Sequence, residues 1–295
     1  MSYYSKKIIC LLIILLSGYG LKAQDTNVFI LDVGSFEVTL LSEGQQQGNK
    51  SILVGATENM LKQTAPDGTF PNAVNAFMVK TEDKTILFDT GFGNKLFDNL
   101  KVCGKTPADI DIVILTHMHG DHIGGLLRGT EKSFPKAMLY IPKPEYDYWM
   151  SDKAGNAAGA RNVINAYKDK LQLFTPGKPD GKQELIPGIR SIATYGHTPG
   201  HTGFMIESEK QKLFIWGDLT HAMAIQMPYP EVAVTYDVDP ATAVKSRQQL
   251  LKYLSDNKIR IAGMHIQFPG IGDIRENKSN GYDFFLICDC EGRYP

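Results

Sequence analysis

Three scarcities narrow the interpretation of this sequence. Only four cysteines occur in 295 residues, and the three that follow Cys10 are an odd number, so we expect no disulfide framework, although one bridge to Cys103 stays open. Lysines and arginines form no cluster, and 31 basic residues are offset by 32 acidic ones, which argues against a nucleic-acid partner. The apolar run Ile8–Leu16 is too short to span a bilayer. Disulfide-stapled, nucleic-acid-binding and membrane-spanning classes are therefore disfavoured.

The N-terminal segment is typical of a secretory signal peptide. Lys6 and Lys7 precede the apolar run, and small residues follow it. We predict that residues 1–24 are cleaved, that the protein is exported to the periplasm or secreted, and that no stable membrane anchor remains. Loss of these two lysines and Lys22, with no acidic residue, takes the net charge from −1 to −4.

Residues 25–295 are expected to form one domain, because no linker, repeat or low-complexity tract divides them. Apolar, β-branched runs predict an early strand series at Val28–Val33, Phe36–Leu41, Ala76–Val79, Thr85–Phe88 and Asp111–Leu115. Later patterns predict helices at Pro144–Met150, Asn156–Leu171 and Pro240–Leu254, and strands at Ile189–Thr194, Phe204–Glu207, Leu213–Trp216 and Ile259–Ala262. This order favours an α/β fold of two stacked sheets with helices outside.

The segment HMHGDH, residues 117–122, holds three of the seven histidines and one carboxylate. Imidazole and carboxylate are ligands of divalent cations, so the cluster predicts metal binding. It follows a short apolar strand and contains Gly120, which favours a loop over a helix. In a loop, His117 and His119 can converge on one ion, while Asp121 and His122 turn toward a second.

Four ligands cannot complete two metal sites, so other histidines and aspartates become candidates. Each of these follows a predicted strand, and strand ends in layered α/β folds meet along one rim. They are His197, His201, Asp218, His221 and His265.

The motifs THMHGDH, GHTPGHTG, WGD and AGMH, together with LFDTG at 87–91, resemble the metallo-β-lactamase superfamily. That resemblance implies an αββα four-layer sandwich: two mixed sheets packed face to face, with helices outside and a dinuclear metal site. Within the superfamily, WGDLTH, EVAVTYDVDP and AGMHIQFPG are similar to the branch of N-acyl-homoserine lactonases and methyl parathion hydrolase.

The resemblance also implies the ligand sets. The first of two divalent ions, with zinc as the expected metal, would be held by His117, His119 and His197. The second would be held by Asp121, His122 and His265, with Asp218 bridging both. His201 is then expected to be a buried structural residue, and Asp89 either to orient a ligand histidine or to form a turn. True metallo-β-lactamases lack the bridging aspartate, which disfavours penicillin hydrolysis.

The expected reaction is hydrolysis by a metal-bridging hydroxide that opens the ester ring of an N-acyl-homoserine lactone, a quorum-quenching activity. Asp121 and His221 are the candidate catalytic residues. The well-known lactonases carry a tyrosine three residues after the bridging aspartate, and His221 stands there as a candidate general acid or a simple pocket residue. A phosphotriester or aryl ester is the alternative substrate, and β-lactamase, iron-dependent oxidoreductase and non-catalytic metal binding are less favoured.

Three points stay open at this stage. Apolar residues near the motifs either line the substrate pocket or belong to the core: Trp149, Met223, Met227, Tyr229 and Phe268. The C-terminal run YDFFLICDC suggests a last strand with Cys288 and Cys290 on one side, which we interpret as packing. The sequence leaves the oligomeric state open, with a homodimer as the candidate assembly.

Overall fold

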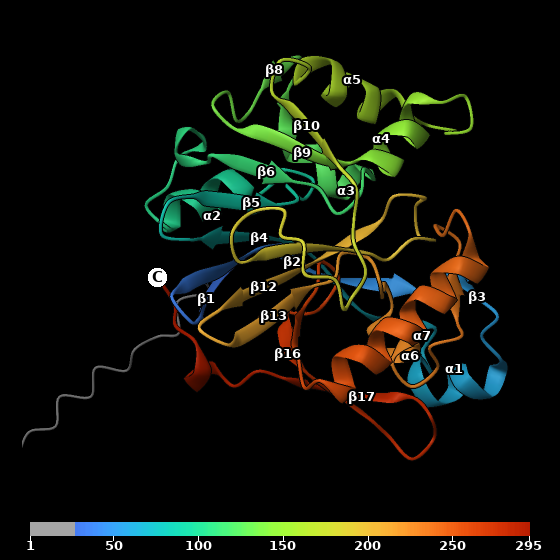
Figure 1. Cartoon of the computed structure of the whole chain (residues 1–295). Coiled ribbons are helices and arrows are strands. Elements are labelled where there is room, and N and C mark those ends of the chain that lie inside the picture. Colours follow the sequence, from blue (N-terminus) through green and yellow to red (C-terminus); the bar gives the residue numbers. More distant parts are fainter. Residues whose placement is uncertain (1–26) are drawn as a thin grey trace, which may run out of the picture.

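Two β-sheets pack face to face and helices cover their outer faces in the computed structural model, which describes residues 27–295 (Figure 1). The predicted four-layer αββα sandwich is thereby confirmed. The predicted signal peptide, residues 1–24, lies outside the described residues. Within them, no helix combines the length and the apolar character needed to cross a membrane.

The first sheet has seven strands in the described chain, in the order β1-β2-β4-β5-β6-β9-β10. Neighbours from β1 to β5 are antiparallel, and those from β5 to β10 are parallel. The strands are β1 (Val28–Val33), β2 (Phe36–Asn49), β4 (Thr69–Lys80), β5 (Thr85–Phe88), β6 (Ile112–Ile114), β9 (Met138–Pro142) and β10 (Leu171–Phe174).

The second sheet has six strands in the same part of the chain, in the order β11-β12-β13-β15-β16-β17. Only β13 and β15 pair in parallel, so both sheets are mixed. The strands are β11 (Ile189–Ala193), β12 (Thr202–Ser208), β13 (Gln211–Ile215), β15 (Arg260–Ala262), β16 (Ile271–Glu276) and β17 (Tyr282–Leu286).

Helices and small ribbons complete the described residues. The helices are α1 (Glu58–Thr64), α2 (Leu96–Val102), α3 (Gly120–Ile123), α4 (Lys143–Met150), α5 (Ala158–Ala166), α6 (Met223–Gln226) and α7 (Pro240–Asp256). Short 3-10 helices lie at Lys50–Ile52, Pro107–Asp109, Gly124–Leu126 and Asp289–Glu291. Two-strand ribbons pair β3 (Leu53–Val54) with β14 (Ala233–Val234), and β7 (Leu127–Arg128) with β8 (Glu131–Lys132).

Alternation along the strands explains the layers, because successive side chains of a strand point to opposite faces. In β5, Ile86 and Phe88 enter the core between the sheets, whereas Leu87 packs in the core beneath α2, α4 and α5. In β13, Leu213 and Ile215 face the first sheet, whereas Phe214 between them packs with Leu251 of α7. Three apolar layers result, and their packing fixes where the strands end.

The structure corrects one predicted helix. Helix α5 ends at Ala166, and Leu171 instead begins strand β10, where it pairs with Leu139 of β9. The helical spacing of Leu171 was coincidental, because burial in a parallel sheet requires apolar residues at the same positions.

The predicted strand position of the two C-terminal cysteines is also wrong. Strand β17 ends at Leu286, and Cys288 and Cys290 lie in and beside the 3-10 turn Asp289–Glu291 rather than on a strand. Both are exposed and, like Cys103, are free thiols. Among the described residues, therefore, Cys103 forms no disulfide bridge.

Candidate metal centre

The predicted site residues gather at one edge of the sandwich because several strands end there. Strand β5 leads into Asp89, β6 into Thr116 and His117, β13 into Asp218, and β15 into His265. Asp89 adopts a left-handed backbone with φ of 57°, which aspartate tolerates better than most residues. The expected common rim is therefore present.

The histidine cluster is a loop only in its first half. His119 has extended backbone angles and caps α3, so the single-turn helix begins at Gly120 and carries Asp121 and His122. This corrects the all-loop prediction, since one glycine at a helix start does not break the helix. The adjacent Gly124 packs closely, and a Cβ there would lie 2.6 Å from the carbonyl oxygen of Phe92.

One group of three imidazoles forms the first candidate ligand set. Nδ1 of His119 lies 3.0 Å from Nε2 of His117 and 3.0 Å from Nε2 of His197. His117 and His197 are buried, and His119 is partly buried. The structure thus brings together three residues from two segments, as predicted.

A second group lies beside the first. The Oδ2 atom of Asp121 lies 3.8 Å from Nε2 of His122 and 3.5 Å from Nε2 of His265. The ligand atoms of all three residues fall within 4.8 Å of one another.

Asp218 lies between the two groups. Its Oδ1 atom is 3.2 Å from Nε2 of His122, in the second group. Its Oδ2 atom is 3.3 Å from Nε2 of His197 and 3.0 Å from Nε2 of His265, so this oxygen contacts both groups. A carboxylate in this position can bridge two cations.

Four of the imidazoles are oriented by a partner on their outer nitrogen. Nδ1 of His122 donates to Asp89 at 2.7 Å, and Nδ1 of His265 donates to the carbonyl of Ala73 at 2.8 Å. Nδ1 of His197 donates to Asp237 at 2.8 Å. His117 is held in the same way by the Thr116 hydroxyl at 3.0 Å. Each Nε2 lone pair is therefore directed into the site, as in metal-binding histidines.

Unsatisfied atoms test whether a cation fits. Among the described residues, Nε2 of His122, Oδ1 of Asp218 and Nδ1 of His221 are buried without a hydrogen-bond partner. Such atoms are costly in a folded protein unless something binds them. All three face the cluster, and a divalent cation accepts lone pairs from imidazole nitrogen and carboxylate oxygen, so the donor set fits two such ions.

The charge balance favours positive charge at the same place. Burial opposes protonation of His197, yet hydrogen bonds to Asp218 and Asp237 raise its pKa to about 9. Burial would raise the pKa of Asp218, but the surrounding histidines, His122 foremost, bring it well below its ordinary value. The buried carboxylates Asp218 and Asp237 thus require cationic partners, and a bound metal would supply positive charge there in place of protons.

His201 and His221 differ in their surroundings. His201 is fully buried, and its Nε2 accepts a hydrogen bond from the backbone N–H of Asp218 at 2.8 Å. Burial lowers the pKa of His201 to about 3, which keeps the ring neutral in that role. His221 instead lies at the site, with Nδ1 3.3 Å from Oδ2 of Asp218.

A pocket of about 410 Å³ opens onto the cluster and is lined by His119, Asp121, His221 and two aromatic side chains. The aromatics are Phe92 and Tyr236, which are 51% and 49% exposed. None of the five apolar residues considered above lines this pocket. Met227 and Trp149 are buried in the core, as their alternative interpretation held.

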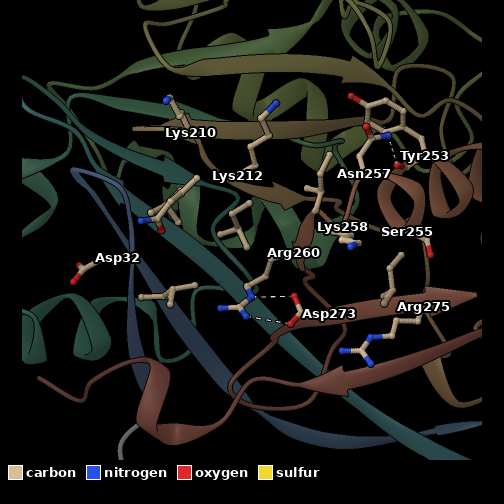
Figure 2. Close-up of a pocket in the computed structure, with 16 residues that line it drawn as sticks. Asp32, Lys210, Lys212, Tyr253, Ser255, Asn257, Lys258, Arg260, Asp273 and Arg275 are labelled. Carbon is tan, nitrogen blue, oxygen red and sulfur yellow. Dashed lines mark hydrogen bonds and ion pairs between the residues drawn. The ribbon is translucent and has the colours of Figure 1, made fainter.

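A larger cavity lies elsewhere. It has a volume of about 880 Å³ and is formed at the opposite ends of β13 and β15, by residues that include Lys212, Lys258 and Arg260 (Figure 2). Arg260 is already paired with Asp273 through two contacts of 3.1 Å. No histidine lines this cavity.

Sequence reasoning missed three residues that support the site. Asp237 orients His197, Thr116 holds His117, and Glu145 accepts hydrogen bonds from both histidine loops. Asp237 lies in the EVAVTYDVDP segment beside Asp239, which caps α7, and nothing in the sequence separates the two roles.

Comparisons with known proteins agree with this geometry. Residues 69–265 match the family model of the metallo-beta-lactamase superfamily. The probable metallo-hydrolase YqgX of Bacillus subtilis (strain 168) is 30% identical over 152 residues, 50% of this chain and 67% of that protein. An N-acyl homoserine lactonase of Bacillus cereus is 26% identical over 200 residues, 56% of this chain and 73% of the other.

A solved structure extends the likeness over most of the fold. AidC, a dizinc quorum-quenching lactonase in complex with a product N-hexanoyl-L-homoserine, superposes with a TM-score of 0.81 at 28% identity, covering 89% of this chain and 98% of that one. With the family match spanning most of the described residues and both sheets in place, the chain belongs to the metallo-beta-lactamase superfamily.

Proposed function

We propose that this member of the superfamily is a dinuclear metal-dependent hydrolase that opens the ester ring of N-acyl-homoserine lactones. One observation carries the proposal: a buried aspartate, Asp218, lies within 3.3 Å of ligand nitrogens from two separate groups. A lone metal site would not need this arrangement. The lactonase names of the Bacillus cereus relative and of AidC support the choice of substrate class.

The residues of the chain have distinct proposed roles. His117, His119 and His197 bind one cation, and Asp121, His122 and His265 bind the other. Bound divalent cations, with zinc proposed, would supply a hydroxide nucleophile at neutral pH and polarise the substrate oxygen. Asp218 holds the two groups at a fixed separation, and the ring of His201 holds Asp218 by accepting a hydrogen bond from its backbone N–H.

Asp121 and His221 are the proposed catalytic residues because both line the pocket and face the reacting centre. Burial lowers the pKa of His221 to about 4, so the ring is neutral at pH 7. We therefore propose that His221 acts on the departing oxygen by hydrogen bonding, rather than by transferring a whole proton. Asp121, whose side chain is 20% exposed, is the cluster carboxylate open to a substrate.

The pocket suits a small ester with an apolar arm. Phe92 and Tyr236 flank the opening and expose aromatic surface, and Tyr236 contacts the ring of His221 edge-on at 5.3 Å. Aromatic faces bind acyl chains through their apolar area. An aryl leaving group would use the same contacts, so phosphotriesters and aryl esters are the comparison substrates.

The test is an assay of purified protein of known metal content. Homoserine lactones of several chain lengths are compared with paraoxon-type phosphotriesters and aryl esters. We expect kcat/KM to be at least tenfold higher for a lactone, about 1.4 kcal/mol of transition-state preference. A His119→Ala variant controls for contaminating activity. Preference for the phosphotriester would replace the lactone proposal, and inertness toward all three classes would overturn it.

We also propose export, which rests on the leader at residues 1–24. Expression with the leader intact, followed by fractionation and N-terminal sequencing, tests this. We expect mature protein that begins near Gln24 or Asp25. Uncleaved protein in the cytoplasm would contradict the proposal.

A further inference from the structure

Glu145 is a buried acid that takes no part in the proposed reaction and is not among the proposed metal ligands. It lies in the first turn of α4 and is fully buried, as its relative exposure of 0% shows. A buried carboxylate is expensive without compensation, and here the compensation comes from hydrogen-bond donors rather than from a cation. Burial raises the pKa of Glu145, while the hydrogen bonds from Thr198, Trp149, Met118 and Gly200 oppose that rise.

Its two oxygens divide their contacts between the two histidine loops. Oε1 accepts from the backbone N–H of Met118 at 3.0 Å, and Met118 lies between His117 and His119. Oε2 accepts from the Thr198 hydroxyl at 2.6 Å and from the backbone N–H of Gly200 at 3.0 Å. One carboxylate therefore ties together two segments about 80 residues apart in sequence.

The same helix touches the ligands from a second direction. Nε1 of Trp149 donates to Oε1 of Glu145 at 2.5 Å, and the Trp149 ring meets the ring of His119 edge-on at 5.8 Å. Gly200 packs so tightly that a Cβ would lie 2.1 Å from the backbone nitrogen of Glu145. Helix α4 thus fixes both the carboxylate and the distance between the loops.

The first ligand group is the one that these contacts hold directly. Its three imidazole nitrogens converge across the two loops that Glu145 joins. In the second group, His122 is oriented by Asp89 and His265 by the carbonyl of Ala73, and neither residue contacts α4 in these interactions.

We infer that Glu145 is a positioning residue that clamps the two histidine loops together and so sets the affinity of the first group alone, His117, His119 and His197. The inference rests on the proposed dinuclear centre. It goes beyond that proposal because it states which part of the fold sets the affinity of each ion.

Glu145→Gln is the direct test. An amide keeps the size but replaces two acceptor sites with N–H donors, which oppose the N–H of either Gly200 or Met118. We expect the affinity of one zinc ion to fall at least tenfold while the affinity of the other ion stays unchanged. The metal-free protein should stay folded, with a melting temperature lowered by the opposed buried donors. Elemental analysis and competitive chelator titration measure both affinities.

Cobalt spectra identify which ion is lost. The Co²⁺-loaded Glu145→Gln protein should resemble His119→Ala, which lacks a first-group ligand, and differ from His265→Ala. Thr198→Val removes a single donor from the clamp and should weaken the same ion by a smaller factor, so it decides the matter if Glu145→Gln fails to fold. Glu207→Gln, at a half-exposed carboxylate far from the histidines, is the matched control.

The possible outcomes bear differently on the inference and on the proposed function. Equal binding of both ions by wild type and Glu145→Gln would overturn the clamp, as would loss of both ions in proportion to unfolding. A wild type that binds two ions but opens no lactone would remove the proposed substrate and leave the clamp standing. A wild type that binds no metal would overturn both.

Discussion

The two ends of strands β13 and β15 carry cavities of opposite character. At one end a pocket of about 410 Å³ meets a cluster of buried imidazoles and carboxylates. At the other end a cavity of about 880 Å³, twice the volume, is bordered by exposed lysines and by Arg260, whose charge is already paired with Asp273 (Figure 2). The smaller cavity is the proposed active site.

The difference teaches that size is a poor guide to function in this fold. Arg260 has both a carboxylate partner and solvent, so little would be gained by binding a ligand there. At the other end, buried atoms such as Nε2 of His122 and Oδ1 of Asp218 lack a hydrogen-bond partner. Unsatisfied, oriented groups, which bind strongly when a ligand arrives, distinguish an active site from a hollow.

The strongest test of this contrast is Asp218→Asn. It removes the charge between the two groups, so we expect kcat/KM to fall at least about 10³-fold, or about 4 kcal/mol, and at least one metal ion to be lost. Steady-state kinetics and elemental analysis measure these effects. Activity within tenfold of wild type would show that Asp218 does not bridge the centre.

His221→Phe should have the next largest effect. Loss of a hydrogen bond to the departing oxygen should lower kcat about 100-fold with the metal content unchanged. Unchanged turnover would leave His221 as a pocket residue only. Loss of a metal ion would make it a ligand, as its grouping with Asp218 and His265 allows.

A paired substitution compares the two ligand groups. Asp89→Asn weakens the orientation of His122, and Asp237→Asn weakens that of His197. Each should reduce the affinity of its own ion by about 10- to 100-fold. Asp237→Asn should leave the other ion unchanged, whereas Asp89→Asn should also weaken the first ion by a smaller factor, because Asp89 accepts from Thr116, which holds His117. Chelator titration of both variants measures this, and equal loss of both ions in each would mean that the groups are not independent.

Tyr236→Ala should have a smaller effect. Loss of the aromatic wall should raise KM for long-chain substrates about fivefold, roughly 1 kcal/mol, while kcat stays within twofold. Chain-length profiles for wild type and variant measure this. An equal change in KM for short and long chains would contradict contact with the acyl arm.

The smallest effect is expected in the larger cavity, at the opposite end of β13 and β15. Lys258→Gln changes an exposed side chain of the larger cavity, so kcat/KM should stay within twofold and stability within about 0.5 kcal/mol. Activity assays and denaturant titration measure these. A tenfold loss of activity would mean that the larger cavity contributes to function.

Much of the fold could be predicted from the sequence, because alternating apolar residues mark buried strands whatever their partners. Val28–Val33 and Thr85–Phe88 have the bounds predicted for them. Leu171 shows the limit of this reasoning. Its apolar character fits a helix face and a parallel strand equally well, and only the pairing with β9 decides between them.

The residues of the candidate site likewise fall into those that the sequence predicts and those that it does not. His117, His119 and Asp218 stand in dense motifs at strand ends, so their meeting could be predicted. Glu145 and Asp237 could not, because each stands in an ordinary helical or loop segment and contacts the site only after the layers have packed. Hydrogen bonds between residues distant in sequence leave no local pattern.

The central claim is that Asp218 lies between two cations, and anomalous X-ray diffraction at the zinc edge tests it most directly. We predict two peaks about 3.5 to 4 Å apart, one beside His117, His119 and His197 and the other beside Asp121, His122 and His265, with Asp218 between them. A single peak in a fully zinc-loaded crystal, or peaks remote from Asp218, would contradict the account.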